Sequence, residues 1–170
     1  MLSLDLVDKG VVTNQIVLTV GYDKESLADG HYTGEVVCDH YGRKIPKHAH
    51  GTQNLGRHTS STRKIIDATM ALFDRIIDKT LLARRLNLTA CNVIREEDIP
   101  AIESYEQISL FDMAEAANAD NNAEEKERAL QEAMLLIKHK YGKNAILKGT
   151  NYTEGATARE RNRSIGGHKA

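Results

Sequence analysis

The residues best suited to chemistry lie in a basic, histidine-rich run, HYGRKIPKHAHGTQNLGRHTSSTRK, at positions 40–64. Arg and Lys side chains in such a run can contact phosphate, and so can hydroxyl and backbone N–H groups at a helix start. We predict phosphate contacts by Arg43, Lys44, Arg57, Ser60, Ser61 and Thr62. A solvated basic surface followed by a simple helix cap would give the same pattern, so this alternative stays open.

The same run also contains residue types that bind zinc. The candidate ligands are Cys38, His40, His48, His50 and His58. Their spacing fits no familiar zinc finger, and histidines in a DNA-facing loop would explain them equally well. A metal-dependent nuclease built on this loop is a third interpretation, but the helix expected next, STRKIIDATMALFDR, lacks the required His or Asn. We therefore expect no metal ligand and no cofactor in this chain.

A different kind of binding is indicated by the stretch QISLF, which has the form Q-x-[S/D]-L-F. It consists of Gln107, Ile108, Ser109, Leu110 and Phe111. Its Leu-Phe pair lies in a solvated acidic stretch with no core of its own, so it could enter an apolar pocket on another protein. A small apolar patch that folds back onto the preceding domain is the alternative.

No stretch predicts an active site. The sequence has no paired carboxylates in an apolar setting, no phosphate loop ending in GK[ST], and no motif for a Ser or Cys nucleophile. Two cysteines are too few for a disulfide framework, and there is no apolar run of about 18 residues or signal peptide. These features predict a cytoplasmic protein that has no membrane partner.

Charge divides the chain into regions that the net charge of -1 conceals. Residues 1–95 contain 13 basic and 10 acidic residues. Residues 96–135 contain 2 basic and 12 acidic residues, and residues 136–170 contain 8 basic and 2 acidic residues. We predict a globular domain over residues 1–95 and a flexible acidic linker over 96–123 that includes the 107–111 motif. An amphipathic helix should follow at 124–142, and a basic, flexible tail at 143–170.

Hydrophobic periodicity predicts the elements that must position these residues. Residues 14–22 alternate, with Ile16, Leu18, Val20 and Tyr22 on one face and Gln15, Val17 and Thr19 on the other. Further elements are expected as the end of a helix at 2–9, a strand at 33–39, a helix at 60–78 and a strand at 82–93. Residues 40–59 should form a loop, and a short edge strand within them is the alternative. The helix at 60–78 should bury a stripe of Ile66, Met70, Phe73 and Ile77, widened by Ile65, Leu72 and Ile76.

These elements predict an α+β fold: an antiparallel sheet with helices on one face and a polar open face. On the last strand, Arg85, Asn87 and Thr89 should share the open face, and Arg84 could lie at the sheet edge. An exposed strand kept polar only for solubility would look the same.

Taken together, these stretches resemble the C-terminal end of a Y-family translesion DNA polymerase of the UmuC (ImpB/MucB/SamB) type. The matching stretches are NQIVLTVGYD, HYGRKIPKHAHGTQNLGRHTSSTRKII, LFDRI and LLARRLNLTA, followed by QISLF. The first four are similar to the little finger domain, and QISLF is similar to the bacterial sliding-clamp motif. The resemblance implies that Gln15, Val17, Thr19, Arg85, Asn87 and Thr89 face primer-template DNA. It also implies a bacterial protein that is associated with the nucleoid.

The resemblance also implies limits. The palm, fingers and thumb that hold the Mg²⁺-binding carboxylates have no counterpart in this sequence, nor do the first strand and most of the first helix of the little finger. We therefore expect a fragment or truncated frame that takes part in translesion synthesis and the SOS response without catalysing alone. Its partners would be double-stranded DNA, the sliding clamp, the remaining polymerase domains and, through an exposed sheet edge, a second copy. A stand-alone nucleic-acid-binding or regulatory protein is the alternative.

Overall fold

A computed structural model describes residues 2–28, 30–99, 114–165 and 168–169 of the chain. The chain divides into two compact units, Met1–Met113 and Ala114–Ala170. In the described part of the chain, no helix combines the length and the apolar character needed to cross a membrane.

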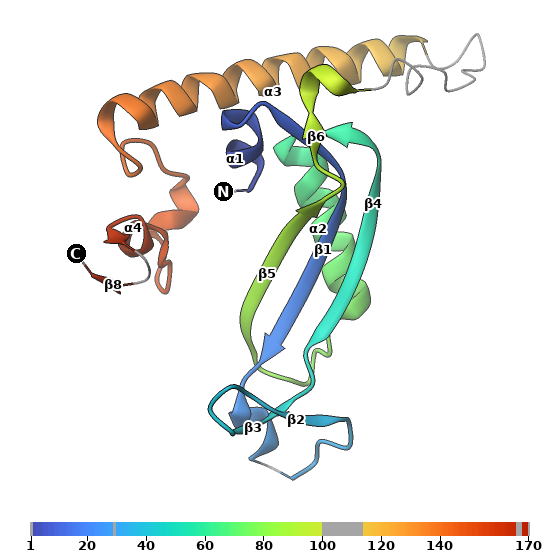
Figure 1. The fold of residues 1–170 in the computed structure, drawn as a ribbon, viewed down its shortest axis with the longest axis vertical. Coiled ribbons are helices and arrows are strands. Elements are labelled where there is room, and N and C mark those ends of the chain that lie inside the picture. The colour runs from blue at the N-terminus through green and yellow to red at the C-terminus, as the bar shows by residue number, and fades with distance from the viewer. Residues whose placement is uncertain (1, 29, 100–113, 166–167, 170) are drawn as a thin grey trace. The chain divides into compact units, whose positions relative to one another are not determined.

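The first unit is built on an antiparallel sheet whose central strand is β1 (Val11–Tyr22). β1 lies between β4 (Ala49–Thr59) and β5 (Ala83–Cys91), and the short β6 (Ile94–Arg95) pairs with its first two residues (Figure 1). Two helices, α1 (Leu2–Asp8) and α2 (Thr62–Ile76), pack together on the apolar side of this sheet. The predicted α+β architecture is therefore confirmed.

The two faces of β1 differ as the alternation predicts. Ile16, Leu18, Val20 and Tyr22 are buried, whereas the residues between them remain partly accessible. Leu18, Val20 and Tyr22 form the core together with Leu72 of α2. The hydroxyl of Tyr22 also accepts a hydrogen bond of 2.9 Å from the backbone N–H of Asp78, which fixes the end of α2 to β1.

Helix α2 lies closest to the sheet at Gly51 of β4. A Cβ at this position would lie 2.9 Å from side-chain carbons of both Leu72 and Ile76, so only glycine permits this approach. The helix consequently turns Ile65 and Leu72 towards the sheet. The predicted stripe is wrong for Ile66 and Met70, which are exposed. It is correct for the residues that are buried or pack against the core: Ile65, Leu72, Phe73, Ile76 and Ile77.

The run at 40–59 is predicted to be a loop, with a short edge strand as the alternative, and the structure contains more strand than either prediction. The run forms β3 (Lys44–Pro46) and the eleven-residue β4. Inward positions of β4 hold Ala49, Gly51 and Gln53, so the strand has no apolar alternation that a sequence pattern could detect. The strand expected at 33–39 is shorter, β2 (Val36–Cys38), and pairs with β3 in a separate two-stranded sheet.

Glycine and hydroxyl groups end and begin the helices at the positions that the sequence indicates. Gly10, with φ of 62°, follows α1, and the side chain of Ser61 caps α2 by accepting a hydrogen bond from the N–H of Lys64. Short 3₁₀ helices at Lys24–Leu27 and Glu96–Asp98 complete the first unit.

The second unit consists mainly of helix α3 (Ala114–Tyr141), which begins ten residues before the helix expected at 124–142. Alanines at 114, 116, 117 and 119 explain the earlier start, because alanine has the highest helix propensity. A 3₁₀ helix (Gly149–Tyr152), helix α4 (Ala158–Arg161) and the paired strands β7 (Ser164–Ile165) and β8 (His168–Lys169) follow.

The segment after α3 is anchored by polar contacts. The ammonium group of Lys138 donates hydrogen bonds to the carbonyl oxygens of Lys143 and Ile146, at 2.8 and 2.9 Å. The amide of Asn162 donates a hydrogen bond of 2.7 Å to Asn144 Oδ1. The described part of the tail expected at 143–170 therefore contains ordered turns linked to the end of α3.

Candidate nucleic-acid interface

The open face of the main sheet brings together six of the residues predicted to contact DNA. The register of β1 with β5 places Val17 opposite Thr89, Thr19 opposite Asn87, and Gly21 opposite Arg85. Directly opposed residues of an antiparallel pair lie on the same face. Gln15, Val17 and Thr19 therefore form one surface with Arg85, Asn87 and Thr89, which we call the polar face.

The polar face extends onto β4, and the residues that β4 contributes were not predicted from the sequence. The register places Asn54, Thr52 and His50 opposite Gln15, Val17 and Thr19. Gln15 Nε2 donates a hydrogen bond of 2.9 Å to Asn54 Oδ1, and Thr19 Oγ1 lies 3.0 Å from His50 Nδ1. The alternation of His50, Thr52 and Asn54 was a usable signal, but Gly51 and Gln53 between them concealed the strand.

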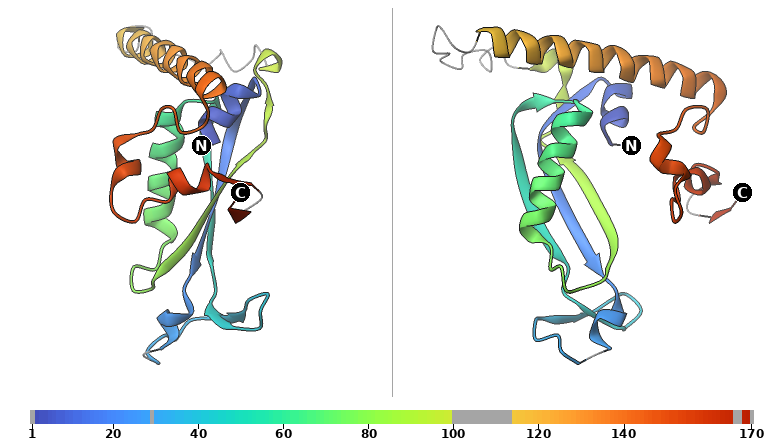
Figure 2. Two further views of the ribbon diagram at one scale, coloured as in Figure 1. Left: turned by 90° about the vertical axis from the view of Figure 1, so that its left-hand side faces the viewer. Right: turned by 180° about the vertical axis from the view of Figure 1, so that it is seen from behind.

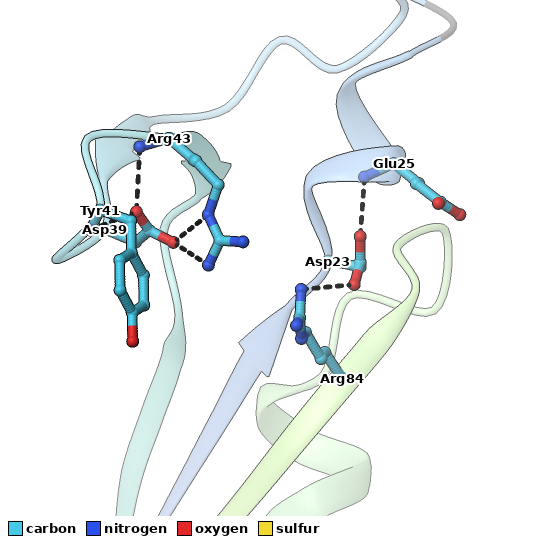
Figure 3. A network of polar contacts seen from close by, with 6 residues as sticks. All are labelled: Asp23, Glu25, Asp39, Tyr41, Arg43 and Arg84. Carbon is cyan, nitrogen blue, oxygen red and sulfur yellow. Dashed lines mark hydrogen bonds and ion pairs between the residues drawn. The ribbon is translucent and has the colours of Figure 1, made fainter.

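Only one arginine of the Arg84-Arg85 pair belongs to the polar face. The register between β1 and β5 shifts between Gly21, opposite Arg85, and Tyr22, opposite Ala83, so Arg84 is the extra residue of a bulge. Its Nη1 lies 3.1 Å from Asp23 Oδ2 (Figure 3). The pKa of Asp23 is lowered, first by the hydrogen bond from the N–H of Glu25 and then by Arg84.

The hairpin of β2 and β3 contains two further predicted residues, Arg43 and Lys44. Arg43 forms a forked contact with Asp39, with Nε at 2.8 Å and Nη2 at 2.6 Å from Asp39 Oδ2, and its guanidinium lies over the ring of Tyr41 (Figure 3). The hydrogen bond from Arg43 lowers the pKa of Asp39, and the same bond raises the pKa of Arg43. The guanidinium of Arg43 thus contacts Asp39 and Tyr41 of the same hairpin, whereas the side chain of Lys44 is exposed.

At the other end of β4, the three hydroxyl residues predicted to hold phosphate take part in contacts within the protein. Ser60 and Ser61 are buried, and Ser61 caps α2. Thr62 Oγ1 donates a hydrogen bond of 2.9 Å to Ser3 Oγ, which joins α2 to α1. This geometry favours the simple helix cap over a phosphate site at the serines. Arg57, near the end of β4, is exposed.

The candidate zinc ligands do not converge. Among the residues that the structure describes, no three His, Cys, Asp or Glu side chains lie together as a metal site requires. Cys38 is on β2 and His50 is on the polar face, where its ring lies at 6.4 Å from the ring of His48. The clamp-like motif Gln107–Phe111 lies outside the described residues.

The geometry defines an α+β domain with one polar, weakly basic sheet face. Over 160 residues the chain is 31% identical to UvrX of Bacillus subtilis (strain 168), a protein whose name refers to the repair of UV damage. The match covers 94% of this chain and 30% of UvrX, so the chain spans about a third of that relative. No family model matches the chain, and no solved structure matches it.

Proposed function

We propose that the first unit binds double-stranded DNA through the polar face, as part of a protein that acts in DNA repair. The observation that carries this proposal is the register of the sheet, which places Val17 opposite Thr89 and Thr19 opposite Asn87. The same register brings Gln15 and Arg85 onto this surface. Hydroxyl and amide groups on such a surface suit contacts to phosphate and sugar, which carry no sequence information. Binding should therefore be independent of sequence.

Cationic side chains lie beyond both ends of this face. Lys44 belongs to the hairpin before β4, and Arg57 lies near the end of β4. The eleven residues of β4 span about 36 Å at about 3.3 Å per residue, close to one helical turn of DNA. The two ends could therefore reach phosphates on either side of a groove while the polar face lies between them.

The role in repair rests on the match to UvrX, which extends over almost the whole chain. The resemblance to the little finger domain of UmuC-type polymerases gives the proposal its finer form: a DNA-gripping module for translesion synthesis. Nucleotide transfer and its Mg²⁺ ions would then belong to other domains of such a polymerase. We ascribe no catalysis to residues 2–99.

The QISLF stretch would tether this module to the bacterial sliding clamp. In this proposal Leu110 and Phe111 fill an apolar pocket of the clamp, and Gln107 contacts the rim of that pocket. Tethering adds effective concentration at the DNA, so a module with weak intrinsic affinity would still remain at the primer terminus.

The two arginines that begin β5 provide a matched test of the DNA-binding face. We expect Arg85→Ala to weaken binding of a fluorescent 20-base-pair duplex several-fold at low salt, measured by anisotropy, and to reduce the salt slope by about one. Arg84→Ala, which removes the partner of Asp23 from the bulge, should leave affinity nearly unchanged. Equal losses in both variants, or binding that does not respond to salt, would contradict the proposed face.

A second pair of variants tests the clamp tether. Leu110→Ala/Phe111→Ala should reduce binding to purified sliding clamp at least thirtyfold in surface plasmon resonance, since pocket-filling side chains dominate such interfaces. Ile108→Ala changes the variable position of the motif and should bind like the wild type. If the double variant binds the clamp equally well, the tether is wrong, whereas the DNA-binding proposal is unaffected.

A further inference from the structure

The end of α3 and the segment after it form the most basic part of the chain. Residues 136–170 contain 8 basic and 2 acidic residues, whereas residues 96–135 contain 2 basic and 12 acidic residues. Glu132, the last acidic residue of α3, precedes Lys140 by about 12 Å along the helix axis. Such an excess of positive charge in a short segment indicates that its partner is a polyanion.

Polar contacts hold this segment in a fixed arrangement. Asn144 Nδ2 donates a hydrogen bond of 3.2 Å to the carbonyl oxygen of Arg159, and Asn162 Nδ2 donates one of 2.7 Å to Asn144 Oδ1. These bonds join α4 to the turn after α3, and Lys138 joins the same turn to the helix. In both views of Figure 2 the segment forms a group of turns near the C-terminal end of α3. Cations from the end of α3 and from α4 therefore lie in one cluster.

Two exposed tyrosines lie within this cluster, and each has a cation over its ring. The ammonium group of Lys140 lies 5.2 Å from the ring centroid of Tyr141, and the guanidinium of Arg159 lies 5.2 Å from that of Tyr152. The two tyrosines are nevertheless 67% and 64% exposed. Rings that remain so exposed add little to the core of the unit, but they present flat apolar surfaces beside positive charge.

We propose that this surface binds single-stranded nucleic acid, with bases stacked on Tyr141 and Tyr152 and phosphates contacted by the surrounding cations. The surface comprises these two tyrosines together with the exposed cations Lys140, Lys143, Lys148, Arg159 and Arg163. A positively charged surface that carries aromatic side chains binds single strands without sequence preference, because every base has a flat face that stacks on an aromatic ring.

The exposed rings favour a single strand over other polyanions. In a duplex the bases stack on each other, whereas the bases of a single strand expose their faces to a protein. An acidic peptide would pair with the cations but has no flat ring for the tyrosines. A single strand therefore matches both the charge and the aromatic side chains of this surface. The inference concerns the second unit and does not require DNA binding by the polar face.

Fluorescence anisotropy of the full chain with a labelled fifteen-base oligothymidylate provides the first test. We expect Tyr141→Ala/Tyr152→Ala to weaken binding at least tenfold at low salt, because the stacking of two bases is lost. Tyr141→Phe/Tyr152→Phe retains both rings and should bind like the wild type. Unchanged affinity in the double alanine variant, or an equal loss in the double phenylalanine variant, overturns the proposal.

The matched control is Tyr41→Ala in the first unit. Tyr41 is 78% exposed, and the guanidinium of Arg43 lies over its ring, so its surroundings resemble those of Tyr152. Its substitution should leave the affinity for oligothymidylate unchanged. A loss as large as that in the double alanine variant would mean that exposed tyrosines anywhere on the chain have this effect, and it overturns the proposed site.

Substitution of the cations tests the contribution of charge. Lys143→Gln/Lys148→Gln should reduce the salt slope for oligothymidylate by about 1.4, because each phosphate contact to a single strand contributes about 0.7. Lys126→Gln changes an exposed lysine in the acidic part of α3 and should leave the slope unchanged. A slope that is the same in the double variant and the wild type overturns the proposal.

Competition identifies the class of partner. Polyglutamate of fifteen residues should displace the labelled strand only at a concentration at least tenfold above that of unlabelled oligothymidylate. Tyr141→Ala/Tyr152→Ala should bind a duplex of the same length within twofold of the wild type. Equal displacement by polyglutamate, or equal losses for duplex and single strand, would identify a general polyanion surface and overturn the assignment to single strands.

Discussion

The two faces of β1 carry alternate residues of one twelve-residue strand and have opposite character. The inner face places Ile16, Leu18 and Val20 against α2, and these side chains are almost completely buried. The outer face carries Gln15, Val17 and Thr19, which are partly exposed and lie beside polar residues of both neighbouring strands. A period of two residues thus gives the strand one face for stability and one face for the DNA contact that we propose, and substitutions can alter each face independently.

The largest expected effect comes from truncating the inner face. Leu18→Ala should lower the free energy of unfolding by about 2–5 kcal/mol, because it leaves a cavity between β1 and Leu72. Thr19→Ala, one residue further on, removes only an exposed contact to His50 and should cost about 1 kcal/mol or less. Urea denaturation followed by circular dichroism measures both. If both variants lose equal stability, the division of β1 between two functions is wrong.

Substitution of two glycines by alanine tests the same difference between the inner and outer faces, because each substitution adds a methyl group to one face. Gly51→Ala would place a Cβ 2.9 Å from carbons of Leu72 and Ile76 on the inner face, and this overpacking should destabilise the fold by about 1–3 kcal/mol. Gly21→Ala would place a Cβ on the outer face, where the nearest atoms belong to Arg85 at 3.8 Å. Its effect should be neutral or slightly stabilising, because alanine restricts the unfolded chain. Thermal unfolding of the two variants would show this contrast, and a destabilised Gly21→Ala variant would contradict it.

The same contrast explains what the sequence could and could not predict. The alternation of β1 and of β5 predicted which residues share the polar face, because apolar side chains marked the opposite face. β4 was not recognised as a long strand, because its inward positions include Gly51, where α2 lies too close for a side chain, and the polar Gln53. The orientation of α2 was predicted only in part. The periodicity of the helix allowed a face that included Ile66 and Met70 as well as Ile65 and Leu72, and the close approach at Gly51 selects the latter pair.

The predicted cations show a second limit of sequence patterns. Arg43, Lys44 and Arg57 look equivalent in the sequence, yet Arg43 is held in a fork with Asp39. Arg84 and Arg85 are adjacent, yet the bulge in β5 directs only one of them to the polar face. Spacing along the chain locates a basic residue, but ion pairing depends on which carboxylate the turn brings close.

The hairpin of β2 and β3 is stabilised by such ion pairs instead of by burial. Acid should therefore lower the stability of this hairpin more than that of the inner face of β1. The pKa of Asp39 is lower in the folded state than its ordinary value of 3.8, chiefly because Arg43 donates to it. The stabilisation is therefore complete above about pH 4 and is lost as pH falls through the lowered pKa. We expect Asp39→Asn to flatten the dependence of Tm on pH below about pH 4.

The control for this acid effect is Asp67→Asn, which changes an exposed aspartate on α2. It should leave the dependence of Tm on pH as in the wild type. An identical acid response in Asp39→Asn and the wild type would mean that the fork between Asp39 and Arg43 contributes nothing measurable. The size of the effect should be small beside that of Leu18→Ala, since the fork is exposed to solvent.

The smallest effect is expected from removing metal, and it tests whether the outer face has a use other than DNA contact. His50 lies on the polar face beside Thr19, with His48 nearby, but a zinc site needs three or four ligands at about 2.0–2.3 Å. Dialysis against EDTA should therefore leave Tm unchanged within about 1 °C. Stoichiometric zinc in the purified chain, lost together with thermal stability in His50→Ala, would instead identify this part of the polar face as a metal site.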